Sequence, residues 1–201
     1  VEREKAIVLD RIKSVFDDKS RYAQHRLLQI LRPNSAASTS ANGNEEDVQA
    51  ITVESLMNAY KSMLANDLID IYVVGDIDLQ VMEQKLKEVL SFEDRQTVNT
   101  GANRVKKPEK IEAYTKEQLD MKQGKLHIGY EIPVYFGDEN FPHVQIFNGI
   151  FGGYAHSKLF MNVRERESLA YYASSSYASH YGLLFVVSGI EPAKEQKAIE
   201  V

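Results

Sequence analysis

The sequence predicts an α+β fold, because segments with helical periodicity alternate with short extended runs. Apolar runs of strand length, each ending near turn-forming residues, indicate strands. Two further extended arms are separated by four residues, 179–182, that fit the bend of a β-hairpin. The predicted strands are 68–74, 126–132, 171–178 and 183–190.

The first half of the chain is predicted to be mainly helical. An apolar stripe indicates a helix over 1–16, and a second helix would start with Ser20 as its N-cap and end before Pro33. Thr52 and Asp78 have the residue type and position of N-caps for two more helices. The last of these helices carries an apolar face that we expect to point inward.

Composition divides the chain into two units. Residues 93–110 are polar and basic and contain a proline, which is typical of a linker between a first unit, 1–92, and a second, 111–201. Residues 34–47 are rich in Ser, Ala and Asn and predict a mobile surface loop. The second unit adds a helix before residue 150 and an amphipathic helix near 159–163, ahead of the hairpin.

Charge and cysteine content narrow the function classes. A net charge of −5 argues against a broad nucleic-acid-binding face, so no nucleic-acid partner is expected. The chain has no cysteine, which excludes disulfides and thiol catalysis and fits a reducing, cytoplasmic location. No apolar run reaches the length of a membrane span. Because the sequence starts at Val1 without Met and stops in a helical pattern, we expect an excised fragment.

A glycine-bearing segment carries the most specific pattern. It contains Gly152-Gly153, then Ser-Lys-Leu-Phe at 157–160, then an Arg-Glu stretch from Arg164 that leads to Leu-Ala-Tyr ending at Tyr171. This succession resembles the second domain of the pitrilysin/insulysin zinc peptidases, which have an inverted His-x-x-Glu-His motif and include the mitochondrial processing peptidase. The resemblance is closest to inactive, bacterial peptidase-homologue subunits.

The resemblance covers most of the chain and implies its architecture. The first unit matches the closing part of the family's first domain, and the second unit matches the opening part of its second domain. The fold it implies is the processing-peptidase-like metallopeptidase fold, with a mixed sheet and helices on one face in each of two similar, truncated units.

The first helix departs from the family at its metal-binding position. Family enzymes hold zinc with the two histidines of His-x-x-Glu-His and a more distant glutamate, and that glutamate position falls on Arg11 here. A guanidinium has no lone pair to donate and stays protonated, so Arg11 cannot bind zinc. Glu4 and Asp10 are weak substitutes, because they lie two turns away and about 100° around the helix. We therefore expect no metal or other cofactor in this fragment.

The resemblance also assigns candidate substrate-binding residues. In active relatives the residues matching Arg164 and Tyr171 reach into the substrate chamber and hydrogen-bond substrate carbonyl oxygens. The alternative for Arg164 is a surface ion pair with a neighbouring glutamate. Gly152 and Gly153 match a substrate-sensing loop of the processing peptidase's non-catalytic subunit, and the alternative is a helix-to-helix turn that needs glycine.

Three functions remain open at this point. The leading hypothesis is a non-catalytic subunit that binds peptide and complements the zinc site of an active homologous peptidase subunit. The second is an active zinc endopeptidase whose third ligand is Glu4 or Asp10. The third is a non-enzymatic assembly or scaffold subunit.

Overall fold

The computed structural model describes residues 1–33, 35–90 and 114–201. The predicted linker, 93–110, lies outside the described residues. The first half contains helices α1 (Glu2–Ser14), α2 (Lys19–Leu31), α3 (Glu45–Ala50), α4 (Val53–Asn66) and α5 (Leu79–Val89), with the 3₁₀ turn η1 (Ala36–Ser38). The second half contains β1 (Gly124–Glu131), α6 (Phe141–Asn148), the π-helical segments η2 (Gly149–Gly153) and η3 (Phe160–Arg166), β2 (Ala170–Ala178), β3 (Leu183–Ile190), the 3₁₀ turn η4 (Pro192–Lys194) and α7 (Glu195–Glu200).

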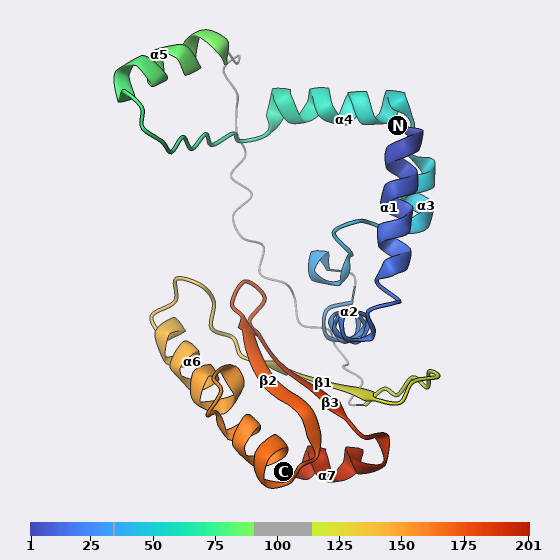
Figure 1. Ribbon diagram of the computed structural model, residues 1–201. Helices are drawn as coiled ribbons and strands as arrows, with labels where there is room; N and C mark the ends of the chain where they lie inside the picture. Colours follow the sequence, from blue (N-terminus) through green and yellow to red (C-terminus); the bar gives the residue numbers. More distant parts are fainter. Residues whose placement is uncertain (34, 91–113) are drawn as a thin grey trace.

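The three strands form one antiparallel sheet in the order β1-β3-β2 (Figure 1). β2 and β3 are the arms of the predicted hairpin, with Ala178 opposite Leu183 next to the bend. Gly182 in the bend has φ +63°, which glycine adopts without strain. The sequence therefore predicted these strands within two residues of their ends, and the α+β class is confirmed.

Helices cover both faces of this sheet, which is why β3 is buried along almost its whole length. On one face, Leu31 of α2 packs against Leu183 and Phe185 of β3. On the other face, Val163 of η3 packs with Leu169 and Ala173, and α7 contributes Ala198. The core of the described chain thus lies around β3, between α2 and the helical segments that follow β1 (Figure 1).

Polar contacts also hold α2 to β1. The Arg32 side chain, in a residue only 2% exposed, donates from Nη2 to Oε1 of Glu131 at 3.1 Å. His127 on β1 lies 3.2 Å through Nδ1 from Oε1 of Gln24 on α2. Burial lowers the pKa of His127 to about 4, because the charged imidazolium would lose its hydration there.

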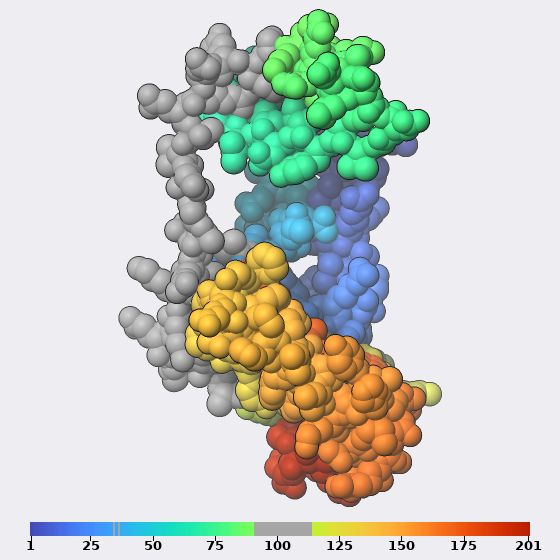
Figure 2. Space-filling model, turned by 90° about the vertical axis from the view of Figure 1, so that its left-hand side faces the viewer, coloured from blue at the N-terminus to red at the C-terminus, as the bar shows by residue number. Residues whose placement is uncertain are grey.

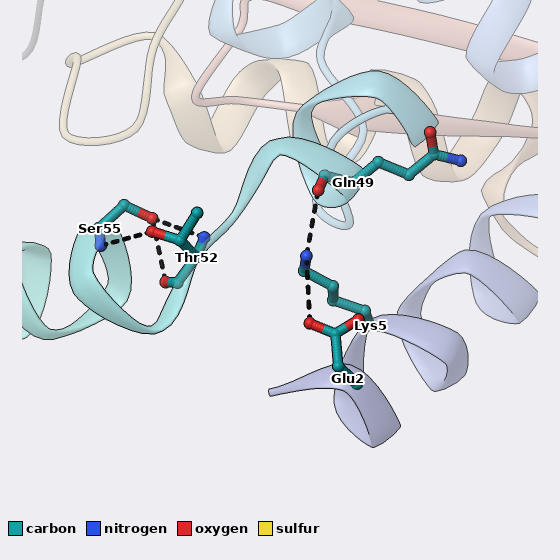
Figure 3. Close-up of polar contacts among 5 residues, drawn as sticks. All are labelled: Glu2, Lys5, Gln49, Thr52 and Ser55. Carbon is teal, nitrogen blue, oxygen red and sulfur yellow. Dashed lines mark hydrogen bonds and ion pairs between the residues drawn. The ribbon is translucent and has the colours of Figure 1, made fainter.

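Several predicted helix ends are confirmed and one is corrected. The Thr52 hydroxyl accepts from the backbone N–H of Ser55 at 3.0 Å, and the Ser55 hydroxyl accepts from the N–H of Thr52 at 2.9 Å, so Thr52 caps α4 (Figure 3). Asp78 caps α5 as predicted. Ser20 was the wrong cap for α2: the carboxylate of Asp18 accepts from the N–H groups of Ser20 and Arg21 instead, since an ionised acceptor suits a helix N-terminus better than a hydroxyl.

Helices α1 and α3 of the first half lie side by side and contact each other (Figure 1). Nζ of Lys5 on α1 donates to the carbonyl oxygen of Gln49 at 3.0 Å and lies 3.4 Å from Oε1 of Glu2 (Figure 3). The lysine thus satisfies a carbonyl at the C-terminal end of α3, where a cation is favourable. The loop predicted over 34–47 is in part wrong, because η1 and the start of α3 lie within it.

The strand predicted over 68–74 is not formed. This segment has no strand pairing, and its apolar side chains are exposed, with Val74 at 98%. The apolar residues of α5 were also expected inside, but Val81 and Val89 are exposed. In Figures 1 and 2, α4, α5 and the chain between them lie apart from the sheet. Within the described residues these segments therefore have no partner that could bury their apolar side chains.

Candidate substrate-binding site

A cavity of about 430 Å³ lies where β2 begins and where the chain leaves β3. Both predicted substrate-binding side chains, Arg164 and Tyr171, line it. Its lining residues come from the end of η3, the start of β2 and the turn η4, and they are Arg164, Glu165, Ser168, Leu169, Ala170, Tyr171, Glu191 and Lys194.

The Arg164 guanidinium is less occupied than its neighbour on the same helical segment. Oε1 of Glu165 lies 3.7 Å from Nε, so the two residues form the surface ion pair named above as the alternative, at a separation too long for a hydrogen bond. Its guanidinium carbon lies 4.6 Å from the ring centre of Phe160, a cation–π contact that orients the side chain. Nε of Arg166, in contrast, donates to Oε1 of Glu167 at 3.2 Å. The Arg164 donors are therefore available to a ligand.

Tyr171 occupies a β-bulge. Ala170 pairs with Ile190 and Tyr172 pairs with Gly189, so Tyr171 is the extra residue between two paired positions. A bulge of this kind turns a side chain away from the regular alternation of the strand. Tyr171 is 66% exposed at the cavity, whereas the Tyr172 hydroxyl is buried. The bulge thus places the Tyr171 ring beside the cavity and shifts the register by one residue there, while the pairs from Tyr172 to Ala178 keep a single register with β3.

A left-handed residue closes the other wall of the cavity. Ser168 has φ +51°, the one positive φ at a non-glycine residue in the described part of the chain. This conformation ends η3, and the Leu169 N–H then donates back to the Val163 carbonyl at 2.9 Å. Leu169 is thereby returned to the core while the next residues open toward the cavity.

The glycine segment is packed closely on the sheet. A Cβ atom at Gly152 would lie 2.5 Å from Oγ and 2.6 Å from the backbone nitrogen of Ser175 on β2. At Gly149 a Cβ atom would lie 2.4 Å from the Tyr154 ring. Gly152 is buried and Gly153 is exposed, and neither lines the cavity. Neither has a positive φ, so the glycines serve close packing here and not a left-handed helix cap.

The position at which family enzymes carry their third zinc ligand lies on α1, on a different part of the molecule. Arg11, Glu4 and Asp10 are all exposed on α1. Over residues 1–33, 35–90 and 114–201, no three His, Cys, Asp or Glu side chains are grouped so that they could hold a metal ion. A guanidinium at the third-ligand position does not fit zinc, since it has no lone pair to donate. We therefore derive no chemical step from a metal on this chain.

Lys194, Glu191 and Ser168 were not predicted from the sequence. Lys194 follows the second hairpin arm in a Glu-Pro-Ala-Lys turn, and its Nζ lies 2.7 Å from Oε2 of Glu191. The hairpin itself was a usable signal, because antiparallel arms place the end of the second beside the start of the first. The left-handed Ser168 had no signal of residue type, since serine is not enriched in that conformation.

Comparisons with known proteins place this fold in a family. The family model described as Peptidase M16 inactive domain matches residues 50–201. The chain belongs to this family, which confirms the resemblance to the zinc peptidases and to their inactive homologues.

Two curated relatives come from Bacillus subtilis strain 168. The chain is 40% identical over 204 residues to a protein named Probable inactive metalloprotease YmfF. This alignment covers 100% of the chain and 47% of the relative. It is 24% identical over 191 residues to a protein named Uncharacterized zinc protease YmxG. This second alignment covers 94% of the chain and 46% of that relative. The chain spans about half the length of the curated relatives it matches.

Solved structures have the same fold. A conserved protein from Enterococcus faecalis V583 superposes with a TM-score of 0.85 at 33% identity, over 99% of this chain and 47% of that one. A peptidase M16 inactive domain from Pseudomonas fluorescens superposes with a TM-score of 0.72 at 16% identity, over 99% and 48%. The second likeness concerns the fold alone.

Among the helices that the structure describes, none is long and apolar enough to cross a membrane.

Proposed function

We propose that this chain is part of a non-catalytic peptidase-homologue subunit that binds peptide and complements the zinc site of an active homologous subunit. The supporting observation is the meeting of Arg164 and Tyr171 at one cavity, each with hydrogen-bond donors that no described residue occupies. The family membership and the arginine at the third-ligand position support a non-catalytic role.

The donor chemistry suits a peptide in an extended conformation. An arginine presents five N–H groups in a fixed fork, and a tyrosine adds one O–H. Donors fixed in position favour carbonyl oxygens of a bound peptide, and they favour an oxyanion still more strongly as charge develops on it. In this proposal Arg164 and Tyr171 hold the substrate, while the zinc and its general base belong to the active homologue.

The test compares cavity variants with matched controls in the complex of the full-length protein and an active homologue. Arg164→Ala and Tyr171→Phe should each lower peptide hydrolysis by the complex about 10- to 100-fold, which is less than the loss of an enclosed oxyanion donor because both side chains are partly exposed. Arg166→Ala and Tyr181→Phe are the controls, because neither residue lines the cavity. They should leave the rate within about twofold of the unaltered complex.

Two results would overturn the proposal in different ways. Full activity of both cavity variants would favour a scaffold subunit, which needs no substrate contact. Stoichiometric zinc in the full-length protein, together with peptide hydrolysis by that protein alone, would favour the active endopeptidase with Glu4 or Asp10 as a ligand. Of Glu4→Gln and Asp10→Asn, the one that removes the third ligand would then lower the zinc content, and Glu2→Gln would not.

A further inference from the structure

The cavity contains a second cationic side chain that the family pattern does not include. Lys194 lines it from η4, whereas Arg164 lines it from η3. We propose that Lys194 is a specificity-determining residue of this site and that it favours peptides bearing a carboxylate next to the bound backbone. This inference rests on the proposed peptide-binding function and names the class of peptide.

The Lys194 ammonium is held in place but not fully occupied. The Lys194 N–H donates to the Glu191 carbonyl at 2.9 Å, and this bond closes the turn. Nζ lies 2.7 Å from Oε2 of the same residue. An ammonium has three N–H groups, and Glu191 is its one carboxylate partner among the described residues, so donors remain for a ligand.

The pair with Glu191 leaves the lysine both charged and accessible. Its hydrogen bond with Glu191 raises the pKa of Lys194, so the ammonium stays protonated at physiological pH. Both side chains are about half exposed, and a surface pair at this spacing contributes little stability. A ligand carboxylate can therefore share the ammonium with Glu191 or displace it.

The balance of donors and acceptors at the cavity favours an anionic ligand group. Glu191 is paired with Lys194, while the Arg164 guanidinium and the Tyr171 hydroxyl have no hydrogen-bond acceptor among the described residues. Glu165 also lines the cavity and is paired with Arg164 at 3.7 Å, so each carboxylate at the cavity already has one cationic partner. Three donor groups from η3, β2 and η4 thus converge on one space, and a carboxylate satisfies more of them than a neutral side chain does.

The carboxylate could be an acidic side chain or the C-terminus of the peptide. The test is fluorescence anisotropy with the full-length protein and labelled peptides that differ only by a central Glu or Gln, and only by a free or amidated C-terminus. Lys194→Gln should weaken binding of the carboxylate peptide of one pair about 3- to 10-fold, and should leave its neutral counterpart unchanged. The pair that shows the loss identifies the source of the carboxylate.

Two further variants separate charge from structure. Lys194→Arg keeps the positive charge and should retain the preference for carboxylate peptides. Lys197→Gln is the matched control, since Lys197 pairs with Glu167 at 3.0 Å and does not line the cavity, and it should bind all four peptides like the unaltered protein.

The inference is overturned if the unaltered protein does not distinguish carboxylate from neutral peptides, or if Lys194→Gln weakens all four peptides equally. These outcomes are distinct from failure of the proposed function. Loss of the complex's activity in Arg164→Ala, with unchanged charge preference in Lys194→Gln, would leave the proposed function standing and reject the role of Lys194.

Discussion

The sheet region, residues 114–201 with α2, and the helical region from α4 to α5 have similar apolar patterns and opposite burial. Leu183 in the sheet region is 0% exposed, because α2 covers its face of β3. Val74 in the helical region is 98% exposed, although it ends an apolar run of the same strand-forming type. A periodic pattern therefore states which side chains an element offers for burial, and a neighbouring element decides whether burial occurs.

The largest expected effect is on the free energy of unfolding, and it compares the most buried position with the most exposed one. Leu183→Ala removes buried methyl groups and leaves a space between β3 and α2, which should lower the free energy of unfolding by about 2–5 kcal/mol. Val74→Ala should change it by no more than about 0.5 kcal/mol, as for other exposed sites. Urea denaturation of the 201-residue chain measures both. Equal losses would show that the two regions do not differ in packing.

The next largest effect compares alanine substitutions at two glycines, Gly152 in the sheet region and Gly75 in the helical region. Gly152→Ala would place a methyl group 2.5 Å from Leu159 Cδ1 and from Ser175 Oγ, so η2 would have to move away from β2. Overpacking of this kind should cost about 1–3 kcal/mol of unfolding free energy. At Gly75, between α4 and α5, the nearest atom to an added Cβ is Ile77 Cγ2 at 3.8 Å. Gly75→Ala should therefore be nearly neutral, and a loss as large as at Gly152 would contradict the packing argument.

The last prediction concerns pH and the polar contact between α2 and β1. The folded-state pKa of His127 is about 4, below its usual 6.5, so between these values the unfolded chain binds more protons. Stability should therefore rise as pH increases from about 4 to 6.5, by at most about 1.4 kcal/mol per pH unit, and fall as pH decreases. His127→Gln should reduce this slope in denaturation measured at several pH values. The exposed His156→Gln should preserve it, and an unchanged slope in both would mean that His127 is not the titrating group.

The elements of the sheet region were predictable because local and tertiary preferences agree there. The β2–β3 hairpin has two arms of strand-forming residues and a four-residue bend with a glycine, and each signal supports the same pairing. The strand at 68–74 was predicted by the same rule and is absent, since a strand needs a partner as well as a pattern. The π-helical turns of η2 and η3 could not be predicted from the sequence, because an amphipathic stripe does not specify how many residues make each turn.

The candidate site was predictable only where residue types repeat a known pattern. Arg164 and Tyr171 were chosen on that basis, and the structure brings both to the same cavity. Lys194 belongs to no pattern and joins them through the hairpin, which is a tertiary relation. Tyr177 on β2 has a structural role, since its hydroxyl donates to the carbonyl of Ile132 at 3.2 Å and also to that of Val134.

The bulge at Tyr171 has a consequence for how this position can vary over time. Because the extra residue stands outside the pairing of β2 with β3, its side chain can be exchanged while every inward-facing neighbour keeps its place. Deleting that one residue is a different event, since Ala170 and Tyr172 would then follow one another in the regular alternation that their partners Ile190 and Gly189 already have, and the bulge would be lost. Under the proposed function, substitution at 171 is thus a route by which descendants of this protein can alter the side chain offered to a ligand, whereas loss of the residue removes it.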